Sequence, residues 1–490
     1  MTLFVPPVAL EPLLRQIDAL AQERGLDAMA VGGTVRDALI GRAIRDVDIA
    51  VDRDALSFAR TLADALSGHF VELDGEQAIA RVVLDHEAVD YVDVAQLQGS
   101  LEDDLRRRDF TVDALAAPLA GGPVVDATGG LDDLPARLVR MTSPAAFDAD
   151  PLRLLRGARI ASELQFELEA ETERAIRERA SEVLKSAAER RRDELARIFA
   201  LDDAYGALLL LDRVGLLDAI LPEVTFARGV TQPGGFHAYD VFEHNLRAVE
   251  ALDAMLRTVR EGSAPAGVIG AEIPRTFGWC IDHLRAYFGE ELSEGRTRAS
   301  LTKLAGLLHD VAKPQTRVLD EAGAHFYGHA EQGAAIAARV LRRLRYSGSD
   351  VAFVSRLIEE HLRPVQLAQV GEAPTRRALY RFYRDLGHAV PALLFLSLAD
   401  AAASRGPHLT PEGWRQHVGY MNSLLVRSFE DDGIVNPPRL LTGHDIMFEL
   451  GLPEGPRIGE LLEAVREAQA TGEVHDRQEA LAFVRAYRGE

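Results

Sequence analysis

Apolar and polar positions follow two different patterns along the chain, and the change comes near residue 150. Before that point, short alternating or β-branched stretches are interleaved with stretches of helical spacing, which is typical of a sheet covered by helices. We expect helices over residues 9–24, 35–41 and 55–68, and strands over residues 28–33, 47–51, 69–73, 78–84 and 89–97. Residues 1–142 are therefore predicted to form an α/β head with a mixed sheet.

After residue 150, helical spacing dominates. Apolar residues recur every three or four positions over residues 150–169, 171–184, 189–201, 241–256, 299–312, 333–346 and 351–362. A turn-rich stretch at 431–443 indicates a boundary before a short tail. The pattern predicts four domains, which are the head at 1–142, a helical neck at 143–205, a mostly α-helical body at 206–430 and a helical tail at 431–490.

Length and composition narrow the class of protein. The 490 residues are too many for one hydrophobic core. No apolar run reaches the length of a membrane span, and the start lacks the features of a signal peptide, so we expect no membrane partner and a cytoplasmic location. The single cysteine, Cys280, excludes an intrachain disulfide and a cysteine-based zinc site.

The formal net charge is −21, which by itself disfavours nucleic-acid binding because a polyanion is repelled by a field of its own sign. The distribution of basic residues changes this picture. Nearly all of them are arginines, and they gather at 106–110 and 189–197. Because the arginine fork matches phosphate oxygens, phosphate-binding patches on an acidic protein stay open as an interpretation.

The stretch VGGTVRDALIGRAIRDVDIAV, residues 31–51, carries the first candidate chemistry. Gly32 and Gly33 follow a predicted strand, where bare backbone N–H groups can approach phosphate oxygens. Arg36 can pair with a phosphate or with its neighbour Asp37. These four residues are predicted to bind a nucleotide.

Three carboxylates extend this candidate site. Asp46 and Asp48 lie one residue apart on the next predicted strand, so their side chains point to the same face. Such a pair is costly unless a cation neutralises it, and Mg²⁺ prefers hard oxygen ligands. With Asp93 on another predicted strand, the acids indicate two-metal phosphoryl transfer with Mg²⁺ held by Asp46 and Asp48. An isolated Asp-x-Asp motif usually lies on the solvated surface of a protein. The ordered combination with the preceding glycine turn is what makes this motif specific for a catalytic site.

Further motifs follow in a fixed order and carry a family resemblance. They are RRRDFTVDALA (106–116), DATGGLDDLPARLVRM (126–141), DADPLRLLRGARIASELQF (148–166), ERRRDEL (189–195) and LTGHDIMFELGLPEGPRIGELL (441–462). Together with residues 31–51, they resemble the class II tRNA nucleotidyltransferases and bacterial poly(A) polymerases. The resemblance implies addition of CMP and AMP, from CTP and ATP, to the 3′ end of tRNA.

The resemblance also implies a set of nucleotide-binding residues. Two arginines would contact the triphosphate, an aspartate beside them would orient them or the ribose, and a helix would carry the base-reading residues. In chain order these residues are Arg107, Arg108, Asp109, Asp150, Arg153, Arg156 and Arg159. Arg190 and Glu194 are either supporting residues or part of a helix face with Glu-Arg pairs.

Two departures from the family pattern matter. Asp113 stands where the family usually has asparagine, which adds negative charge near a triphosphate site and leaves the role of this position open. After Asp93, the segment 95–98 reads AQLQ where the family usually has Thr-Phe-Arg. Residues 70–100, which would include the loop that helps choose the incoming nucleotide, are thus the divergent part of the head.

By this resemblance, Asp150 and Arg153 read the incoming base. Positions i and i+3 of a helix share a face. A carboxylate only accepts hydrogen bonds and a guanidinium only donates them, which matches the amine and ring nitrogen shared by cytosine and adenine. Uracil and guanine place a carbonyl oxygen where the amine would be, and Asp150 would repel it. The alternative is a surface ion pair that contributes little.

A second constellation lies in the predicted body and resembles the HD phosphohydrolase superfamily. Its residues are histidines and aspartates in separate stretches, namely His244, His309, Asp310 and Asp400, with His329 and His361 as candidate extra ligands. Imidazole and carboxylate suit a second divalent metal such as Mn²⁺, Ni²⁺, Co²⁺ or Mg²⁺. A lone buried histidine is more often a satisfied core residue. Hydrolysis stays open, because such domains can be retained as scaffolds.

The leading hypothesis is template-independent CCA addition to tRNA. Alternatives within the family are A-only or CC-only addition and poly(A) polymerisation. An HD phosphohydrolase with an inert head is an alternative of another class, and the intact Asp-x-Asp argues against it. A protein-modifying uridylyltransferase would also join such domains, but its pair of small C-terminal ligand-binding domains is not seen in the sequence, and the Asp150 logic rejects UTP. The oligomeric state is left unknown.

Overall fold

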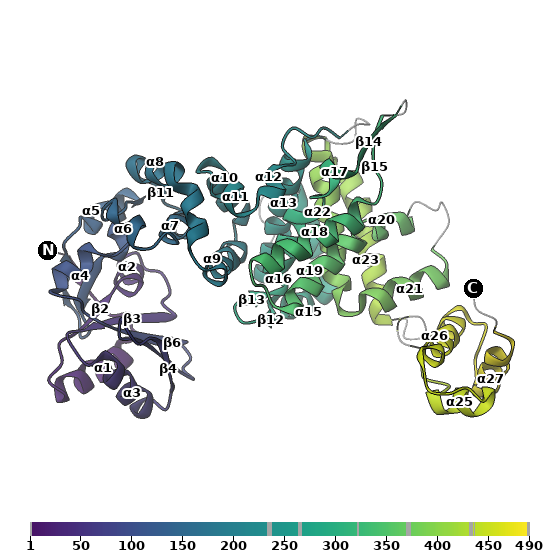
Figure 1. Cartoon of the computed structure of the whole chain (residues 1–490), viewed down its shortest axis with the longest axis horizontal. Helices are drawn as coiled ribbons and strands as arrows, with labels where there is room; N and C mark the ends of the chain where they lie inside the picture. Colours follow the sequence, from purple (N-terminus) through teal and green to yellow (C-terminus); the bar gives the residue numbers. More distant parts are fainter. Residues whose placement is uncertain are drawn as a thin grey trace. The chain divides into compact units, whose positions relative to one another are not determined.

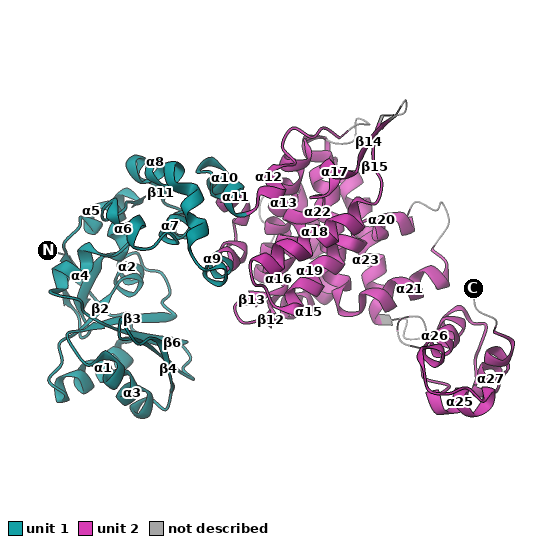
Figure 2. Ribbon diagram, viewed as in Figure 1, with its two compact units in different colours: residues 1–194, 209–220 teal, residues 195–208, 221–490 magenta. Residues whose placement is uncertain are grey.

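The computed structural model describes residues 2–487 except 233–237, 263–266, 321–322, 369–373, 431–434 and 436. The chain divides into two compact units, unit 1 with residues 1–194 and 209–220 and unit 2 with residues 195–208 and 221–490 (Figure 2). The predicted boundary between body and tail falls at 430/431, next to residues outside the described ranges. The finer division into four domains stays a prediction.

Unit 1 begins with a seven-stranded mixed sheet in the order β4-β5-β6-β3-β2-β7-β9. Its strands are β2 (Ala28–Val31), β3 (Asp46–Val51), β4 (His69–Asp74), β5 (Ile79–Val83), β6 (Tyr91–Gln96), β7 (Leu115–Pro118) and β9 (Val125–Asp126). β3 and β6 are parallel, and the other neighbours are antiparallel. The five strands expected from alternation are present, whereas β7 and β9 are not among the predicted strands, because stretches of four and two residues give little strand signal.

Helices α1 (Glu11–Glu23), α2 (Gly33–Leu39) and α3 (Ala55–Ala65) pack on this sheet, with α1 and α3 on the side opposite α2 (Figure 1). The spacing of apolar residues explains the docking of α1, which buries Leu13, Leu14, Ile17 and Ala21 along one stripe. β3 buries Val47 and Ile49, so its acidic residues point to the opposite face.

The rest of unit 1 is mainly helical, with two short strand pairs, β1 (Leu3–Phe4) with β8 (Gly122–Pro123) and β10 (Leu138–Val139) with β11 (Glu167–Leu168). Its helices are α4 (Leu101–Arg106), α5 (Gly130–Ala136), α6 (Ala145–Ala149), α7 (Arg153–Leu164), α8 (Ala170–Arg179), the start of α9 (Ala188–Ala200), the end of α10 (Ala204–Arg213) and α11 (Leu216–Ile220). The single helix expected over 150–169 is wrong at both ends. Asp150 ends α6 in an extended conformation, and residues 167–168 form a short strand with 138–139, because Gln165 adopts a left-handed conformation that stops α7.

Unit 2 is built from helices that pack around α22 (Val390–Arg405). The others are α12 (Pro222–Thr225), α13 (Val241–Glu261), α14 (Val268–Phe277), α15 (Ile281–Gly289), α16 (Arg298–Leu308), α17 (Lys313–Thr316), α18 (His329–Arg343), α19 (Gly348–Glu360), α20 (Arg363–Ala368), α21 (Arg376–Leu386) and α23 (Pro411–Glu430). A hairpin of β14 (Arg317–Asp320) and β15 (Gly323–Phe326) precedes α18. The stretch Arg376–His408 has the length and apolarity of a membrane span, but 78% of its most apolar window is buried inside the protein, as in a core helix.

In the part of the tail that the structure describes, the helices from residue 443 on are α25 (Gly443–Leu450), α26 (Pro456–Thr471) and α27 (Arg477–Ala486). They bury a small apolar cluster of their own that includes Ile446, Leu461 and Val465. The predicted fold class, a mixed-sheet head followed by a mostly helical remainder, is confirmed.

Candidate active site and metal centre

The glycine turn lies between β2 and α2 and brings three predicted residues together. Gly32 has a φ of +63°, a left-handed conformation that favours glycine, and its N–H donates to the carbonyl of Leu115 at 3.0 Å. A Cβ atom on Gly32 would lie 2.9 Å from Nη1 of Arg108 and 3.5 Å from Oδ2 of Asp48. The left-handed backbone thus disfavours any other residue at position 32, and a side chain there would also displace the guanidinium of Arg108.

The strand register explains how the carboxylates gather. Asp48 on β3 is directly opposite Asp93 on β6, and Asp46 is opposite Tyr91. Burial raises the pKa of Asp48 to about 6, and the negative charge of Asp93 adds to this shift. A cation between these carboxylates would remove the repulsion, so the residues fit the hard divalent metal that the sequence predicts.

Asp93 has a partner that the sequence did not reveal. Arg81 on β5 donates from Nε and Nη2 to the two carboxylate oxygens of Asp93, both at 2.8 Å. The guanidinium carbon of Arg81 also lies 3.6 Å from the centre of the Tyr91 ring. The signal that could have found Arg81 is the pairing of β5 with β6, which places Arg81 opposite Asp93. The third carboxylate is therefore neutralised by an arginine in this structure.

Arg36 and Asp37 form a buried network rather than facing solvent. Nε of Arg36 donates to Oδ1 of Asp37 at 2.8 Å, and its Nη1 forms an ion pair with Asp113. Although burial opposes it, Asp113 and Asp37 raise the pKa of Arg36 above its ordinary value. This contact explains why an acid is tolerated at position 113, since Asp113 compensates a buried arginine instead of adding free charge.

A cavity of about 1480 Å³ lies within unit 1 and is bordered by β5, β6, α4, α6, α7 and α9. Its arginines are Arg81, Arg106, Arg107, Arg108, Arg153, Arg156 and Arg190. Its acidic residues are Asp74, Glu76, Asp104, Asp150 and Asp193. The arginines outnumber the acids, so the cavity has a local positive balance that suits a polyphosphate although the whole chain is strongly negative.

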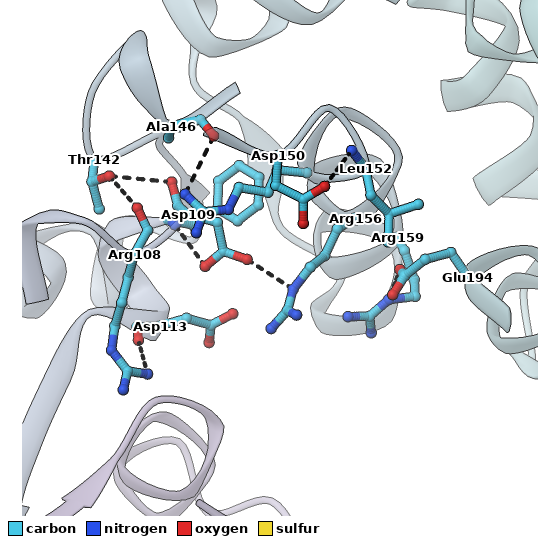
Figure 3. Close-up of polar contacts among 12 residues, drawn as sticks. Arg108, Asp109, Asp113, Thr142, Ala146, Asp150, Leu152, Arg156, Arg159 and Glu194 are labelled. Atoms are coloured by element: carbon cyan, nitrogen blue, oxygen red, sulfur yellow. Dashed lines mark hydrogen bonds and ion pairs between the residues drawn. The ribbon is translucent and has the colours of Figure 1, made fainter. Parts of the chain in front are cut away.

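Asp109 lies behind the cavity and holds one of its arginines (Figure 3). Its Oδ1 accepts from the N–H of Phe110 at 3.0 Å, and its Oδ2 accepts from Nε of Arg156 at 2.8 Å. Burial would raise the pKa of Asp109, but the positive charges of Arg156 and Arg153 outweigh it and lower the pKa below its ordinary value. Asp109 therefore stays ionised and orients Arg156 towards the cavity.

The two residues expected to read the base both line the cavity, and each is held by other groups. Asp150 is paired with Arg190 of α9, whose Nη2 donates to Oδ2 at 2.6 Å. Nη1 of Arg153 donates to the main-chain carbonyl of Arg107 at 3.1 Å and to that of Ala146 at 3.3 Å. The premise that the pair lies on one helix is wrong, because α7 begins at Arg153 and Asp150 precedes it in extended backbone.

Of the other predicted arginines, Arg107 lines the cavity and Arg159 does not. Arg107 donates to Asp104 at 3.0 Å and to the carbonyl of Gln98 at 2.9 Å. Arg159 is buried and does not line the cavity, because Nε of Arg159 donates to Glu194 at 2.6 Å (Figure 3). The sequence grouped Arg159 with the nucleotide-binding residues, whereas in this structure it ties α7 to α9.

Unit 2 brings all six predicted HD residues to one buried centre. Nε2 of His244 lies 3.2 Å from Oδ1 of Asp400 and 3.3 Å from Oδ2 of Asp310. Nε2 of His329 and Nε2 of His361 lie 3.4 Å and 3.8 Å from Oδ1 of Asp310. Nε2 of His309 lies 3.1 Å from that of His244. These donor atoms form overlapping groups of three, each with all atoms within 4.8 Å, so they fit a divalent metal.

Main-chain carbonyls fix the histidine rings of this centre. Nδ1 of His309 lies 2.8 Å from the carbonyl of Gly306, Nδ1 of His361 lies 2.7 Å from that of Ile358, and Nδ1 of His329 lies 2.6 Å from that of Phe326. A carbonyl only accepts, so each Nδ1 carries the hydrogen and each Nε2 is left for a ligand.

Electrostatics at the centre also fit a cation. Burial lowers the pKa of His361 to about 4, so this ring is neutral. Burial acts against the charged form of His309 too, but Asp310 and Asp400 raise its pKa to about 10, so Nε2 of His309 carries a proton that a bound metal would displace. Lys313, which is not among the predicted ligands, places Nζ 2.6 Å from Oδ2 of Asp310. Its position three residues after Asp310 is the signal that could have revealed it.

Known families match three parts of the chain. Residues 28–140 match the Poly A polymerase head domain, residues 165–227 match the probable RNA and SrmB-binding site of polymerase A, and residues 283–403 match the HD domain. The A-adding tRNA nucleotidyltransferase of Deinococcus radiodurans is 39% identical over 470 residues, which cover 94% of this chain and 96% of the relative. The chain belongs to the tRNA nucleotidyltransferase family. The predicted family is thus confirmed.

Other members of the tRNA nucleotidyltransferase family share this organisation. The CC-adding tRNA nucleotidyltransferase of Thermus thermophilus is 35% identical over 471 residues, which cover 94% of each chain. A solved structure described as the complex of CCA-adding enzyme with CTP superposes with a TM-score of 0.60 at 20% identity, covering 98% of this chain and 96% of that one. At that identity, the likeness concerns the fold.

Proposed function

We propose that this tRNA nucleotidyltransferase adds CMP or AMP, taken from CTP or ATP, to the 3′ end of tRNA without a template. The observation that carries the proposal is the cavity of unit 1, in which Asp150 and Arg153 face the same space as Arg107 and Arg108. Arg108 also lies against the glycine turn beside Asp48. Base-reading groups, phosphate-binding groups and a carboxylate site are therefore adjacent.

Asp46 and Asp48 are the residues that would hold Mg²⁺, which supplies charge neutralisation for the attacking hydroxyl and the leaving pyrophosphate. The arginines of the cavity bind the triphosphate through their forks. Asp109 keeps Arg156 in place, and the pairing of Arg36 with Asp113 braces the helix that follows the glycine turn. Water is displaced from this positively charged space when a nucleotide fills it.

Base choice follows from the fixed polarity of two side chains. Arg153 only donates and Asp150 only accepts, so together they match the ring nitrogen and the exocyclic amine of cytosine or adenine. A carbonyl at the amine position, as in uracil or guanine, would meet the lone pairs of Asp150. The enzyme therefore selects two of four bases without a nucleic-acid template.

A finer question is which nucleotides the enzyme adds to the tRNA 3′ end. Relatives matched along nearly the whole chain are named A-adding and CC-adding enzymes, which makes partial addition a specific alternative to complete CCA addition. The test supplies tRNAs that end before C, after C and after CC, each with CTP, ATP or both, and sequences the products. Failure to extend any of these tRNAs would contradict the proposal, whereas long A tails would favour a poly(A) polymerase.

We also infer that the centre around His309 and Asp310 binds a divalent metal such as Mn²⁺, Ni²⁺, Co²⁺ or Mg²⁺, because its Nε2 atoms and carboxylates converge. A second activity, hydrolysis of a phosphoester, is favoured by the adjacent Lys313, which suits a phosphate oxygen. Metal analysis of the purified protein and hydrolysis of bis-p-nitrophenyl phosphate with each metal test the two parts. The tRNA substrate implies action in the cytoplasm.

A further inference from the structure

Asp150 has an unusual environment for a residue that meets a ligand. Its backbone is extended, with φ −151° and ψ 104°, where α6 ends and before α7 starts, and its N–H donates to the carbonyl of Ala146 in α6 at 3.4 Å. Arg190 of α9 donates from Nη1 to Oδ1 at 3.2 Å and from Nη2 to Oδ2 at 2.6 Å. An arginine forty positions later in the sequence therefore holds both oxygens of the carboxylate.

The hydrogen bonds of Asp150 leave little acceptor capacity. Oδ1 also accepts from the N–H of Leu152 at 3.1 Å (Figure 3). A carboxylate oxygen has two lone-pair positions, so Oδ1 is filled by Arg190 and Leu152, whereas Oδ2 has one position left. The side chain of Asp150 is 26% exposed and lines the cavity, as does Arg190.

We propose that Arg190 is a positioning residue for base selection, whose fork holds Asp150 so that one lone pair of Oδ2 remains for the amine of the incoming base. The proposal rests on the proposed function, because it assumes that Asp150 meets the base. With both oxygens held by Arg190, the lone pairs of Asp150 also stay directed at the place where a carbonyl of the wrong base would lie, and repel it. Arg190 acts through Asp150 and needs no contact with the base.

The fork distinguishes this role from a simple positive charge. An arginine guanidinium is planar and bonds both carboxylate oxygens at fixed angles, whereas the lysine ammonium is a point charge on a flexible stem. Arg190→Lys should therefore keep the charge in the cavity and lose the orientation of Asp150. Arg190→Ala should lose both.

The experiment measures kcat and KM for single-nucleotide incorporation with CTP, ATP, UTP and GTP. The variants are Arg190→Ala, Arg190→Lys and the control Arg197→Ala, an exposed arginine two turns further along α9 that does not line the cavity. We expect Arg190→Ala to lower the ratio of kcat/KM for CTP and ATP to kcat/KM for UTP and GTP by roughly tenfold, which is the size of effect expected for the loss of a charged hydrogen bond. Arg190→Lys should restore the preference only in part, and the control should leave it unchanged.

A double-mutant cycle with Asp150→Asn tests whether Arg190 works through Asp150. Adding Arg190→Ala to Asp150→Asn should change selectivity little, because the group it orients has already lost its role. Additive effects would overturn the proposal. An equal loss of rate for all four nucleotides would also overturn it and would assign Arg190 to the triphosphate, and full rescue by lysine would show that charge alone matters.

Equilibrium binding keeps the proposal testable apart from turnover. Calorimetry with each nucleotide should show that Arg190→Ala reduces the difference in affinity between CTP or ATP and UTP or GTP. Thermal melting should show that the fold stays intact, because the Arg190 side chain is half-exposed. If the wild type binds CTP or ATP selectively but extends no tRNA, the proposed function fails and the role of Arg190 stands. If binding is unselective in the wild type, the role of Arg190 fails.

Discussion

The carboxylate site of unit 1 and the HD centre of unit 2 are built on opposite principles. In unit 1, the acids lie on a sheet surface, with Asp46 exposed and Asp93 neutralised by Arg81. In unit 2, donor atoms of six side chains converge in the interior. Among the residues that the structure describes, groups of three such donors within 4.8 Å occur only at the HD centre.

This difference in exposure and in number of donor atoms indicates which kind of ligand each site can bind. Mg²⁺ keeps several waters and takes phosphate oxygens as ligands, so a site that works with it needs few carboxylates and an open side. Unit 1 has that form. The HD centre supplies imidazole and carboxylate donors whose orientation is fixed by main-chain carbonyls, so it is ready for a metal before any substrate arrives.

The largest expected effect comes from removing an acid of unit 1. Asp48→Ala or Asp46→Ala should lower nucleotide addition by several orders of magnitude, because the metal contact organises both the attacking and the leaving oxygen. Binding of tRNA should persist. Single-turnover incorporation with CTP or ATP and a tRNA gel-shift measure the two properties, and near-normal turnover in either variant would remove the two-metal assignment.

A smaller effect is expected for Asp150, the acid that we propose reads the base. Asp150→Asn keeps the shape of the side chain but replaces one acceptor with a donor, so the repulsion against a uracil carbonyl disappears. A lost charged hydrogen bond costs about 1.5–3 kcal/mol, so use of CTP and ATP should fall while UTP or GTP misincorporation rises. Competition assays with all four nucleotides measure the ratio. Wild-type selectivity in this variant would mean that the base is read elsewhere, most plainly by residues 70–100.

Much of the fold and of the family could be predicted from sequence because the signals are local. The Asp-x-Asp strand follows from alternation, since Val47 and Ile49 must face the core and the acids then face away. The order of the HD residues along the chain predicts their site, and the structure places Asp310 and Asp400 within 3.3 Å of Nε2 of His244. These features can be recognised from the types of the residues and their spacing along the chain alone.

The partners of the site residues could not be predicted, because they depend on pairing between distant segments. Arg81 meets Asp93 through the β5–β6 register, and Arg190 meets Asp150 through the packing of α9 beside the α6–α7 junction. The pairing of Arg36 with Asp113 likewise joins positions 77 residues apart. The sequence showed the charges but not which of them neutralise one another.

A modest effect is expected when Arg81 is removed. If Asp93 belongs to the metal site, Arg81→Ala should strengthen Mn²⁺ binding by unit 1 roughly two- to fivefold, because a partly exposed ion pair contributes about 0–1 kcal/mol. Electron paramagnetic resonance of bound Mn²⁺ measures this without turnover, and a variant that also lacks the HD ligands removes the background of unit 2. Unchanged Mn²⁺ affinity would indicate that Asp93 serves to hold Arg81 and not the metal.

The smallest effect on nucleotide addition is expected from destroying the HD centre. The double variant His309→Ala with Asp310→Ala removes two donors that are shared among the three overlapping donor groups, so metal bound by unit 2 should be lost. His388→Ala, which changes an exposed histidine of the same unit, is the matched control.

Addition of CMP or AMP should stay near the wild-type rate, because the cavity and the carboxylates lie within unit 1. Metal content by mass spectrometry, hydrolysis of a phosphodiester and tRNA extension are measured together with thermal melting. A collapse of tRNA extension in a variant that melts normally would mean that the two sites are coupled. The open site of unit 1 would then depend on the preformed site of unit 2 for its activity.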